Sequence, residues 1–84
     1  MTNIHNELLQ HLKDEAHDVC EYAMLSEKAE EEGHDALSEK LEMIAYDEFT
    51  HAYTIKHCME RMGIELDNEA KMLWEKAEKA FHDM

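Results

Sequence analysis

Three ionisable side chains occupy helix positions where a packed interface calls for apolar ones. Glu15 belongs to a series of positions spaced alternately by four and three residues, and Glu48 and His51 belong to a second such series. Side chains at this spacing lie along one face of a helix, so each series predicts a packed seam. An unpaired buried charge is costly, so these three side chains need a compensating partner. The other members of the two series are Leu8, Leu12, Val19, Tyr22, Ser26 and Ala29, and then Leu37, Leu41, Ile44, Ile55, Cys58 and Met62.

A bound metal cluster would be such a partner. A glutamate on one helix and a Glu-x-x-His string on its neighbour supply the ligands of dinuclear carboxylate sites in helical bundles. The string alone is uninformative, because Glu31 and His34 also match it but flank Gly33 and do not share a helix face. Glu48 and His51 are the informative pair, because they lie on the predicted seam opposite Glu15. We therefore take Glu15, Glu48 and His51 as candidate metal ligands and candidate catalytic residues.

Other readings of the polar residues stay open. Polar side chains in a seam between long helices can serve only to fix the register of packing, without any metal. Tyr22, two turns beyond Glu15, either donates a hydrogen bond toward a carboxylate of the site or fills the core. His17 lies about 200° around the helix from Glu15 and is not expected among the ligands. The other histidines are expected to be exposed; they are His5, His11, His34, His57 and His82.

The elements that position these residues are three helices in a single domain spanning residues 1–84. We expect helices at about 3–32, 35–62 and 67–81, because apolar residues recur there with helical spacing. Gly33 and Gly63 follow the first two helices, as glycine does just beyond a helix end. Thr2 or Asn3, Asp35 and Asp67 are the expected N-terminal caps.

Helix geometry predicts that the three candidate ligands meet. A short turn at Gly33 makes the first two helices antiparallel. Counted from that turn at 1.5 Å per residue, Glu15, Glu48 and His51 stand at heights of about 27, 23 and 27 Å. All three therefore lie at one level near the middle of the hairpin. The same arithmetic separates Cys20 from Cys58 by about 18 Å, which excludes a disulfide between them.

A wide apolar surface predicts self-association. Both long helices carry further apolar residues off their seams, which an 84-residue chain would leave exposed. Two hairpins related by a two-fold axis would bury them in an all-α four-helix bundle. The packing of the short third helix is left open. The residues in question are Leu9, Ala16 and Ala23 on the first helix, and Tyr46, Phe49 and Tyr53 on the second.

Composition narrows the partners. The net charge of −13 argues against nucleic acid and anionic membranes, which both attract basic surfaces, and favours cations. No apolar run approaches the roughly 20 residues of a membrane span, and the region after Met1 is polar, so a cytoplasmic protein is expected. Cys20 and Cys58 form no CxxC pair, so one chain cannot build a four-cysteine metal site. We expect Cys58 buried on the seam and Cys20 partly exposed.

The spacing of these motifs resembles one half of the rubrerythrin diiron domain, within the ferritin-like group. The resemblance rests on Glu15, on Tyr22 seven residues later, on the stretch SEKAEEEG at 26–33, and on EFTH at 48–51. It covers a little under half of the chain. A rubrerythrin chain has two such halves and usually a rubredoxin domain, whereas this chain has one half and lacks rubredoxin cysteines. The encapsulated ferritins are a related comparison, since they too are half-bundles that assemble.

The resemblance implies that Glu15, Glu48 and His51 bind iron, and that a complete site needs two chains. A homodimer, or a larger assembly, would hold two iron ions per dimer, with manganese or zinc as other candidates. The implied activity is that of a ferroxidase or peroxidase-like oxidoreductase, which would need fresh Fe(II) or an external electron donor. Two alternatives stay open: a metal-free helical interaction module, and an iron storage or delivery protein without turnover.

Overall fold

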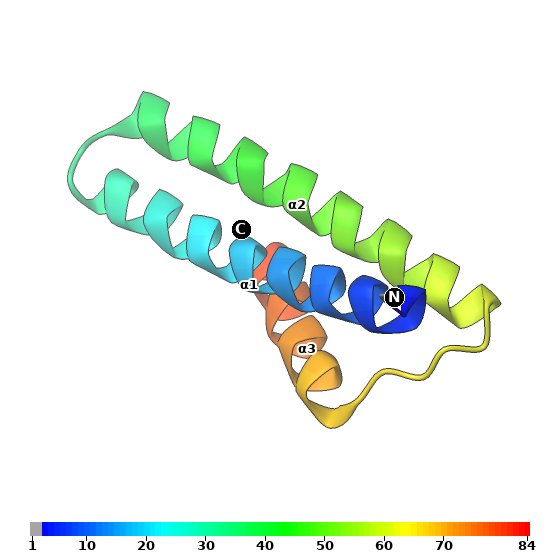
Figure 1. The fold of residues 1–84 in the computed structure, drawn as a ribbon. Helices are drawn as coiled ribbons and strands as arrows, with labels where there is room; N and C mark the ends of the chain where they lie inside the picture. Colours follow the sequence, from blue (N-terminus) through cyan, green and yellow to red (C-terminus); the bar gives the residue numbers. More distant parts are fainter. Residues whose placement is uncertain (1–2) are drawn as a thin grey trace.

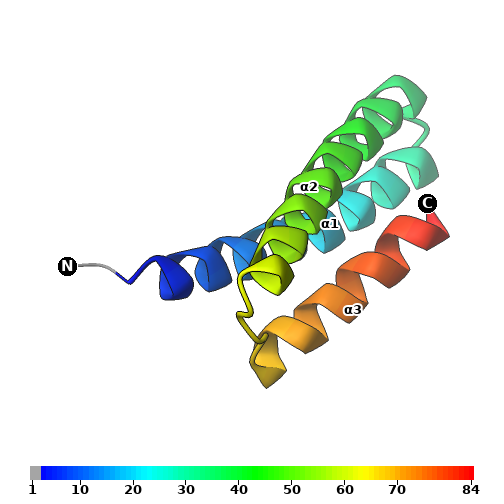
Figure 2. The same ribbon diagram turned by 90° about the vertical axis from the view of Figure 1, so that its right-hand side faces the viewer.

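The computed structural model describes residues 3–84, and over these residues it consists of three helices. α1 (Ile4–Glu31) and α2 (Asp35–Arg61) lie side by side and run in opposite directions (Figure 1). α3 (Asn68–Asp83) packs against one side of this pair (Figure 2). The predicted all-helical fold is confirmed, with each helix end within two residues of its expected place. None of the described helices combines the length and apolar character that a membrane span requires.

Both long helices end at a glycine in the left-handed conformation. Gly33 has φ 80° and Gly63 has φ 74°, a region that residues with a Cβ rarely enter. The reversals are closed by backbone hydrogen bonds, since the His34 N–H donates to the Ala29 carbonyl at 2.8 Å and the Ile64 N–H to the Met59 carbonyl at 2.9 Å. These bonds satisfy carbonyls that a helix end otherwise leaves free.

The caps follow the sequence at two of three helices. Asn3 accepts a hydrogen bond from the His5 N–H at 2.9 Å, and Asp67 accepts one from the Ala70 N–H at 2.8 Å. Thr2, the alternative first cap, lies outside the described residues. The prediction for Asp35 is wrong, because His34 takes the non-helical cap position after the tight Gly33 turn and makes no side-chain cap bond. Asp35 instead lies in the first turn, where a carboxylate still favours the helix dipole.

On α1 the predicted seam is present, with Leu8, Glu15 and Tyr22 half-buried, and on α2 the seam is shifted by one position. Leu12, Val19, Ser26 and Ala29 are buried on α1. On α2 the buried line consists of Ser38, Ala45, Ala52 and Met59. The first three of these are small residues, which let the helix backbones approach closely, so the larger side chains turn to the flank. The expected burial of the α2 series is therefore wrong for Leu37, Ile44, His51, Cys58 and Met62, which are exposed.

α3 covers the flank of the hairpin that the sequence left open for self-association. Trp74 is 8% exposed and packs with Leu12, Ala52 and Met59, while its ring stacks on Phe49 at a centroid distance of 5.3 Å. Phe81 stacks on Phe49 and meets Tyr46 edge-on. The chain's own third helix therefore occupies part of the surface from which self-association was inferred, while Tyr46 and Tyr53 stay 41% and 55% exposed. The off-seam residues that pack there are Leu9, Ala16, Tyr46, Phe49 and Tyr53.

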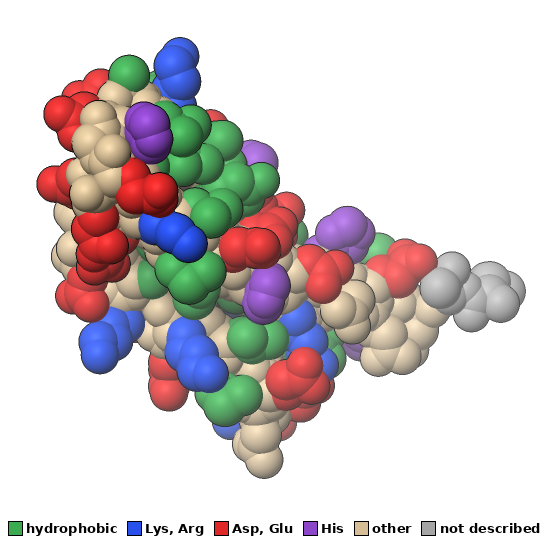
Figure 3. All heavy atoms as spheres, turned by 90° about the vertical axis from the view of Figure 1, so that its left-hand side faces the viewer, with side chains coloured by type: hydrophobic (Ala, Val, Ile, Leu, Met, Phe, Trp, Pro, Cys, Tyr) green, Lys and Arg blue, Asp and Glu red, His purple; other side chains and the backbone are tan. Residues whose placement is uncertain are grey.

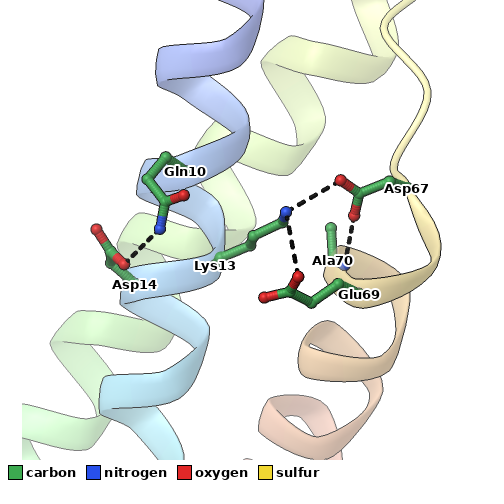
Figure 4. Close-up of polar contacts among 6 residues, drawn as sticks. All are labelled: Gln10, Lys13, Asp14, Asp67, Glu69 and Ala70. Atoms are coloured by element: carbon green, nitrogen blue, oxygen red, sulfur yellow. Dashed lines mark hydrogen bonds and ion pairs between the residues drawn. The ribbon is translucent and has the colours of Figure 1, made fainter.

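One lysine ties the start of α3 to α1. The Lys13 Nζ donates to Asp67 Oδ2 at 3.0 Å and lies 3.7 Å from Glu69 Oε2 (Figure 4). The Asp67 bond raises the pKa of Lys13, and the Ala70 N–H and then Lys13 lower the pKa of Asp67. One turn away, the Gln10 side chain donates to Asp14 within α1 (Figure 4). The Asp67 carboxylate thus both caps α3 and fixes it against α1.

A pair of buried serines joins α1 to α2 near the turn. The Ser26 Oγ donates to the Ser38 carbonyl at 2.9 Å, and the Ser38 Oγ donates to the Ser26 carbonyl at 2.8 Å. Each is 6% exposed. The two hydroxyls lie 3.0 Å apart. These reciprocal bonds let two polar residues occupy the seam without an unsatisfied group.

We expect Ser26→Ala and Ser38→Ala each to lower the free energy of unfolding by about 1–3 kcal/mol, because each leaves a buried acceptor without its donor. The double variant should lose less than the sum of the two, since both changes remove parts of one network. Urea denaturation of the four proteins forms the cycle. Strict additivity would contradict a coupled pair.

Candidate metal centre

Glu15, Glu48 and His51 form one cluster between α1 and α2. Each offers a ligand atom, and these atoms all lie within 4.8 Å of one another. The two residues from α2 are three positions apart, so they share a helix face, and Glu15 meets them from α1. The predicted convergence of these three side chains is therefore present in the structure.

One carboxylate oxygen of this cluster lacks a partner. Glu15 Oε2 is shielded from solvent and accepts no hydrogen bond from the described residues. His51 Nδ1 lies 3.5 Å from this oxygen and forms an ion pair with it only when the imidazole is protonated. Buried carboxylate oxygens are normally satisfied, so this one has room for a further partner such as a water molecule or a cation.

The second carboxyl holds its proton unusually tightly. A hydrogen bond with Glu15 raises the pKa of Glu48 to about 7, and burial and the charge of Glu15 add to this shift. The nearby charge of His51 opposes it. Two carboxylates this close repel each other when both are ionised, so they share a proton. A divalent cation would replace that proton and remove the repulsion.

This shift predicts how the stability of the metal-free protein depends on pH. Because the pKa of Glu48 rises from 4.5 unfolded to about 7 folded, the folded state binds more protons between these values. The free energy of unfolding should therefore fall as the pH rises from about 4.5 to about 7. Urea denaturation with a chelator present, at points across this range, measures the slope.

The variant Glu48→Gln keeps the size of the side chain and removes its titration, so it should flatten the slope. Glu39→Gln, at an exposed position on the same helix, is the control and should keep it. An equal slope in wild type and Glu48→Gln would show that Glu48 does not titrate in this range.

The cluster lies on the flank of the hairpin opposite α3. Phe49 and Ala16 face α3, and each neighbours a cluster residue that points about 100° further around its helix. The cluster is consequently open to solvent, with the His51 side chain 60% exposed and that of Glu15 22%. A surface hollow of about 660 Å³ lies elsewhere, beside Cys20 and Met84. A single chain thus presents the three ligands on a surface and does not enclose them.

The other candidate residues lie outside the cluster. Tyr22 is half-buried and, among the described residues, donates no hydrogen bond to Glu15, so its role as a supporting group stays a prediction. His17 is exposed on the outer face of α1, as expected, and forms a separate group with Asp18 and Glu21. Sequence reasoning overlooked Asp18 in this group. All three members lie on α1, and their side chains are between 44% and 67% exposed, as surface charges commonly are.

The cysteines and remaining histidines complete the comparison with the sequence. Both cysteines are free, with Cys20 half-buried as predicted and Cys58 exposed, contrary to prediction. The other histidines are exposed, as expected; they are His5, His11, His34, His57 and His82.

Neither models of protein families, nor curated proteins, nor solved structures match this chain. The functional argument therefore rests on the chemistry of the cluster.

Proposed function

We propose that this chain is a non-haem diiron carboxylate protein in which two copies share one dinuclear site. The observation that carries the proposal is the convergence of Glu15, Glu48 and His51, with one carboxylate oxygen buried and unpartnered and the other carboxyl holding a proton. Two carboxylates and an imidazole form a donor set suited to iron or manganese. Zinc also fits this set.

A second copy would complete the site. One chain supplies three ligands on an open face, which is too few to enclose a pair of cations. A homodimer would supply four carboxylates and two imidazoles, so two divalent ions would be neutralised when the interface buries them. Glu15, Glu48 and His51 of both chains would hold the two ions.

The proposed activity is oxidation of Fe(II) by O2 or hydrogen peroxide. Two Fe(II) ions in this site would supply the two electrons that reduce either oxidant. The chain would hold these ions: Glu15 and Glu48 would release their shared proton when a cation binds, and His51 of each chain would supply a neutral ligand. Since Cys20 and Cys58 form no redox pair, continued turnover would need fresh Fe(II) or an external electron donor.

An oxidation assay tests this activity. Fe(II) is added without oxygen, then O2 or peroxide is introduced, and formation of Fe(III) is followed by near-ultraviolet absorbance. We expect faster oxidation than in buffer, and loss of this acceleration in His51→Ala. The control is His57→Ala, an exposed histidine on the same helix. Equal rates in wild type and His51→Ala would contradict the proposal.

Two other functions are kept. Exposed apolar side chains on α2, including Leu37 at 50% and Met62 at 52%, favour a helical interaction module that needs no metal. In that case, alanine at Glu15, Glu48 and His51 should leave stability unchanged or higher, because no cation compensates the paired carboxylates. The charge of −13 suits iron storage or delivery without turnover, because it attracts cations. The same charge disfavours nucleic acid as a partner, and we propose a cytoplasmic location. Metal bound without accelerated oxidation would indicate storage.

A further inference from the structure

One face of α2, which includes Glu48 and His51 of the cluster, has the same order of apolar and ionisable residues when read from either end. We call it the open strip: Leu37, Leu41, Ile44, Glu48, His51, Ile55, Cys58 and Met62. Three apolar side chains precede the Glu48–His51 pair, and three follow it at the same spacing. Leu37 at 50%, Ile44 at 38% and Met62 at 52% are exposed. Leu41 and Ile55 are half-buried, and Ile55 also packs against the core beside Trp74. The exposed part of the strip is therefore an apolar face with an ionisable centre, while α3 packs on the other flank of the hairpin.

We propose that a second copy of this chain covers the open strip with its Gly33 turn at the opposite end of the bundle. The proposal rests on the shared site above and specifies its partner's orientation. The two-fold axis would run perpendicular to the helices and pass between Glu48 and His51. Each α2 then lies antiparallel to the other, and the strip pairs with itself: Leu37 with the partner's Met62, Leu41 with the partner's Cys58, Ile44 with the partner's Ile55, and Glu48 with the partner's His51.

The α1 helices fit the same axis. Glu15 would face the partner's Glu15, and Leu8 would face the partner's Tyr22, since both pairs are equally spaced about position 15. Leu8 and Tyr22 are half-buried in one chain and would gain contacts on this flank. Two facing carboxylates repel each other unless cations lie between them. In this orientation the two Glu15 carboxylates would therefore need cations at the axis, where Glu48 and His51 also lie.

Charge distinguishes this orientation from its alternative, in which the axis runs along the bundle and both turns meet at one end. The turn end, residues 27–42, carries seven carboxylates and two lysines, a net charge of −5 with His34 neutral. At the other end, residues 3–11 and 55–69 carry five carboxylates, one lysine and one arginine, a net charge of −3, with three histidines. Two of these carboxylates, Asp67 and Glu69, are paired with Lys13 of the same chain. Meeting turns would bring −5 against −5 within about one Debye length. Opposite turns bring −5 against −3, which is the weaker repulsion.

The surface around the turn supports this reading. Seen from the turn end of the hairpin, acidic side chains crowd one edge, and exposed hydrophobic side chains gather beside them (Figure 3). The apolar groups favour burial by a second copy, while the adjacent carboxylates disfavour a second acidic turn at the same place.

The distance between the two turns tests the orientation. We would place a nitroxide label at Glu32→Cys in a Cys20→Ala, Cys58→Ala background and measure the separation by pulsed dipolar spectroscopy, without metal and with Zn²⁺. Opposite turns lie about 17 residues on either side of the axis, which predicts a separation of about 50 Å. Turns at one end, on helices about 10 Å apart, predict a separation below about 30 Å. A label at Thr50→Cys, near the axis, should give a short distance and reports that a dimer is present.

A disulfide provides a second readout. In a Cys20→Ala background, Leu41→Cys should form a covalent dimer with the partner's Cys58 under mild oxidation, whereas the off-strip control Met43→Cys should not. A short turn-to-turn distance, or no dipolar signal at either label position, overturns the orientation. Because neither readout measures metal, a long distance without bound iron would keep the orientation and remove the diiron function. A short distance with two ions per dimer would do the reverse.

Discussion

Replacing Glu48 by alanine should reduce the metal content from two ions per dimer to none. Glu48 provides one of the two carboxylates of each chain and holds the proton that a cation displaces. Its loss leaves each chain with Glu15 and His51 alone, so a dimer keeps only two carboxylates, too few to neutralise two divalent ions. Elemental analysis of the purified variant after incubation with Fe(II) without oxygen measures this effect. The fold should persist, because Glu48 is only half-buried and repels Glu15.

The sequence offers a matched control for this variant. Glu31 begins the second Glu-x-x-His string, but it lies at the exposed end of α1 and does not join the cluster. Glu31→Ala removes the same group and should keep two ions per dimer. Retention of two ions in Glu48→Ala would contradict the assignment of the ligands.

Replacing Trp74 by alanine should give the largest loss of stability. The Trp74 ring joins all three helices, since it packs with Leu12 of α1 and with Ala52 and Phe49 of α2. Truncating a buried tryptophan removes about 3–5 kcal/mol from the free energy of unfolding. Domains of this kind are stable by about 5–15 kcal/mol, so the change is a large share of the total. Urea denaturation followed by circular dichroism measures it without relying on tryptophan fluorescence.

Met72 supplies the control on the same helix. It is 49% exposed, so Met72→Ala should change the free energy of unfolding by no more than about 0.5 kcal/mol. Equal effects of Trp74→Ala and Met72→Ala would mean that α3 does not pack on the hairpin in solution.

Much of the local structure could be predicted because it depends on short-range rules. Gly33 and Gly63 mark the helix ends, since the reversals need a positive φ that glycine adopts easily. Asn3 and Asp67 act as caps. The meeting of Glu15 with Glu48 and His51 followed from the rise per residue and a single turn, two quantities that tertiary packing hardly changes.

The predictions that failed depend on how the helices pack. The helical spacing of large apolar residues predicts one seam on α2, but Ser38, Ala45 and Ala52 allow a closer helix contact and form the seam instead. The sequence could not show that Phe49 is covered within its own chain, because this depends on how Trp74 and Phe81 of α3 pack against it. These two outcomes together leave part of the expected α2 seam open and place α3 over part of the surface assigned to self-association.

The ratio of metal to protein, measured together with the native mass, tests the central proposal most directly. The protein would be produced in iron-supplemented medium, weighed by native mass spectrometry and analysed for bound metals. The shared site predicts close to one iron per chain in a dimer or a larger even-numbered assembly. A monomer, or a dimer without metal even after anaerobic addition of Fe(II), would contradict the diiron function and leave the helical fold in place.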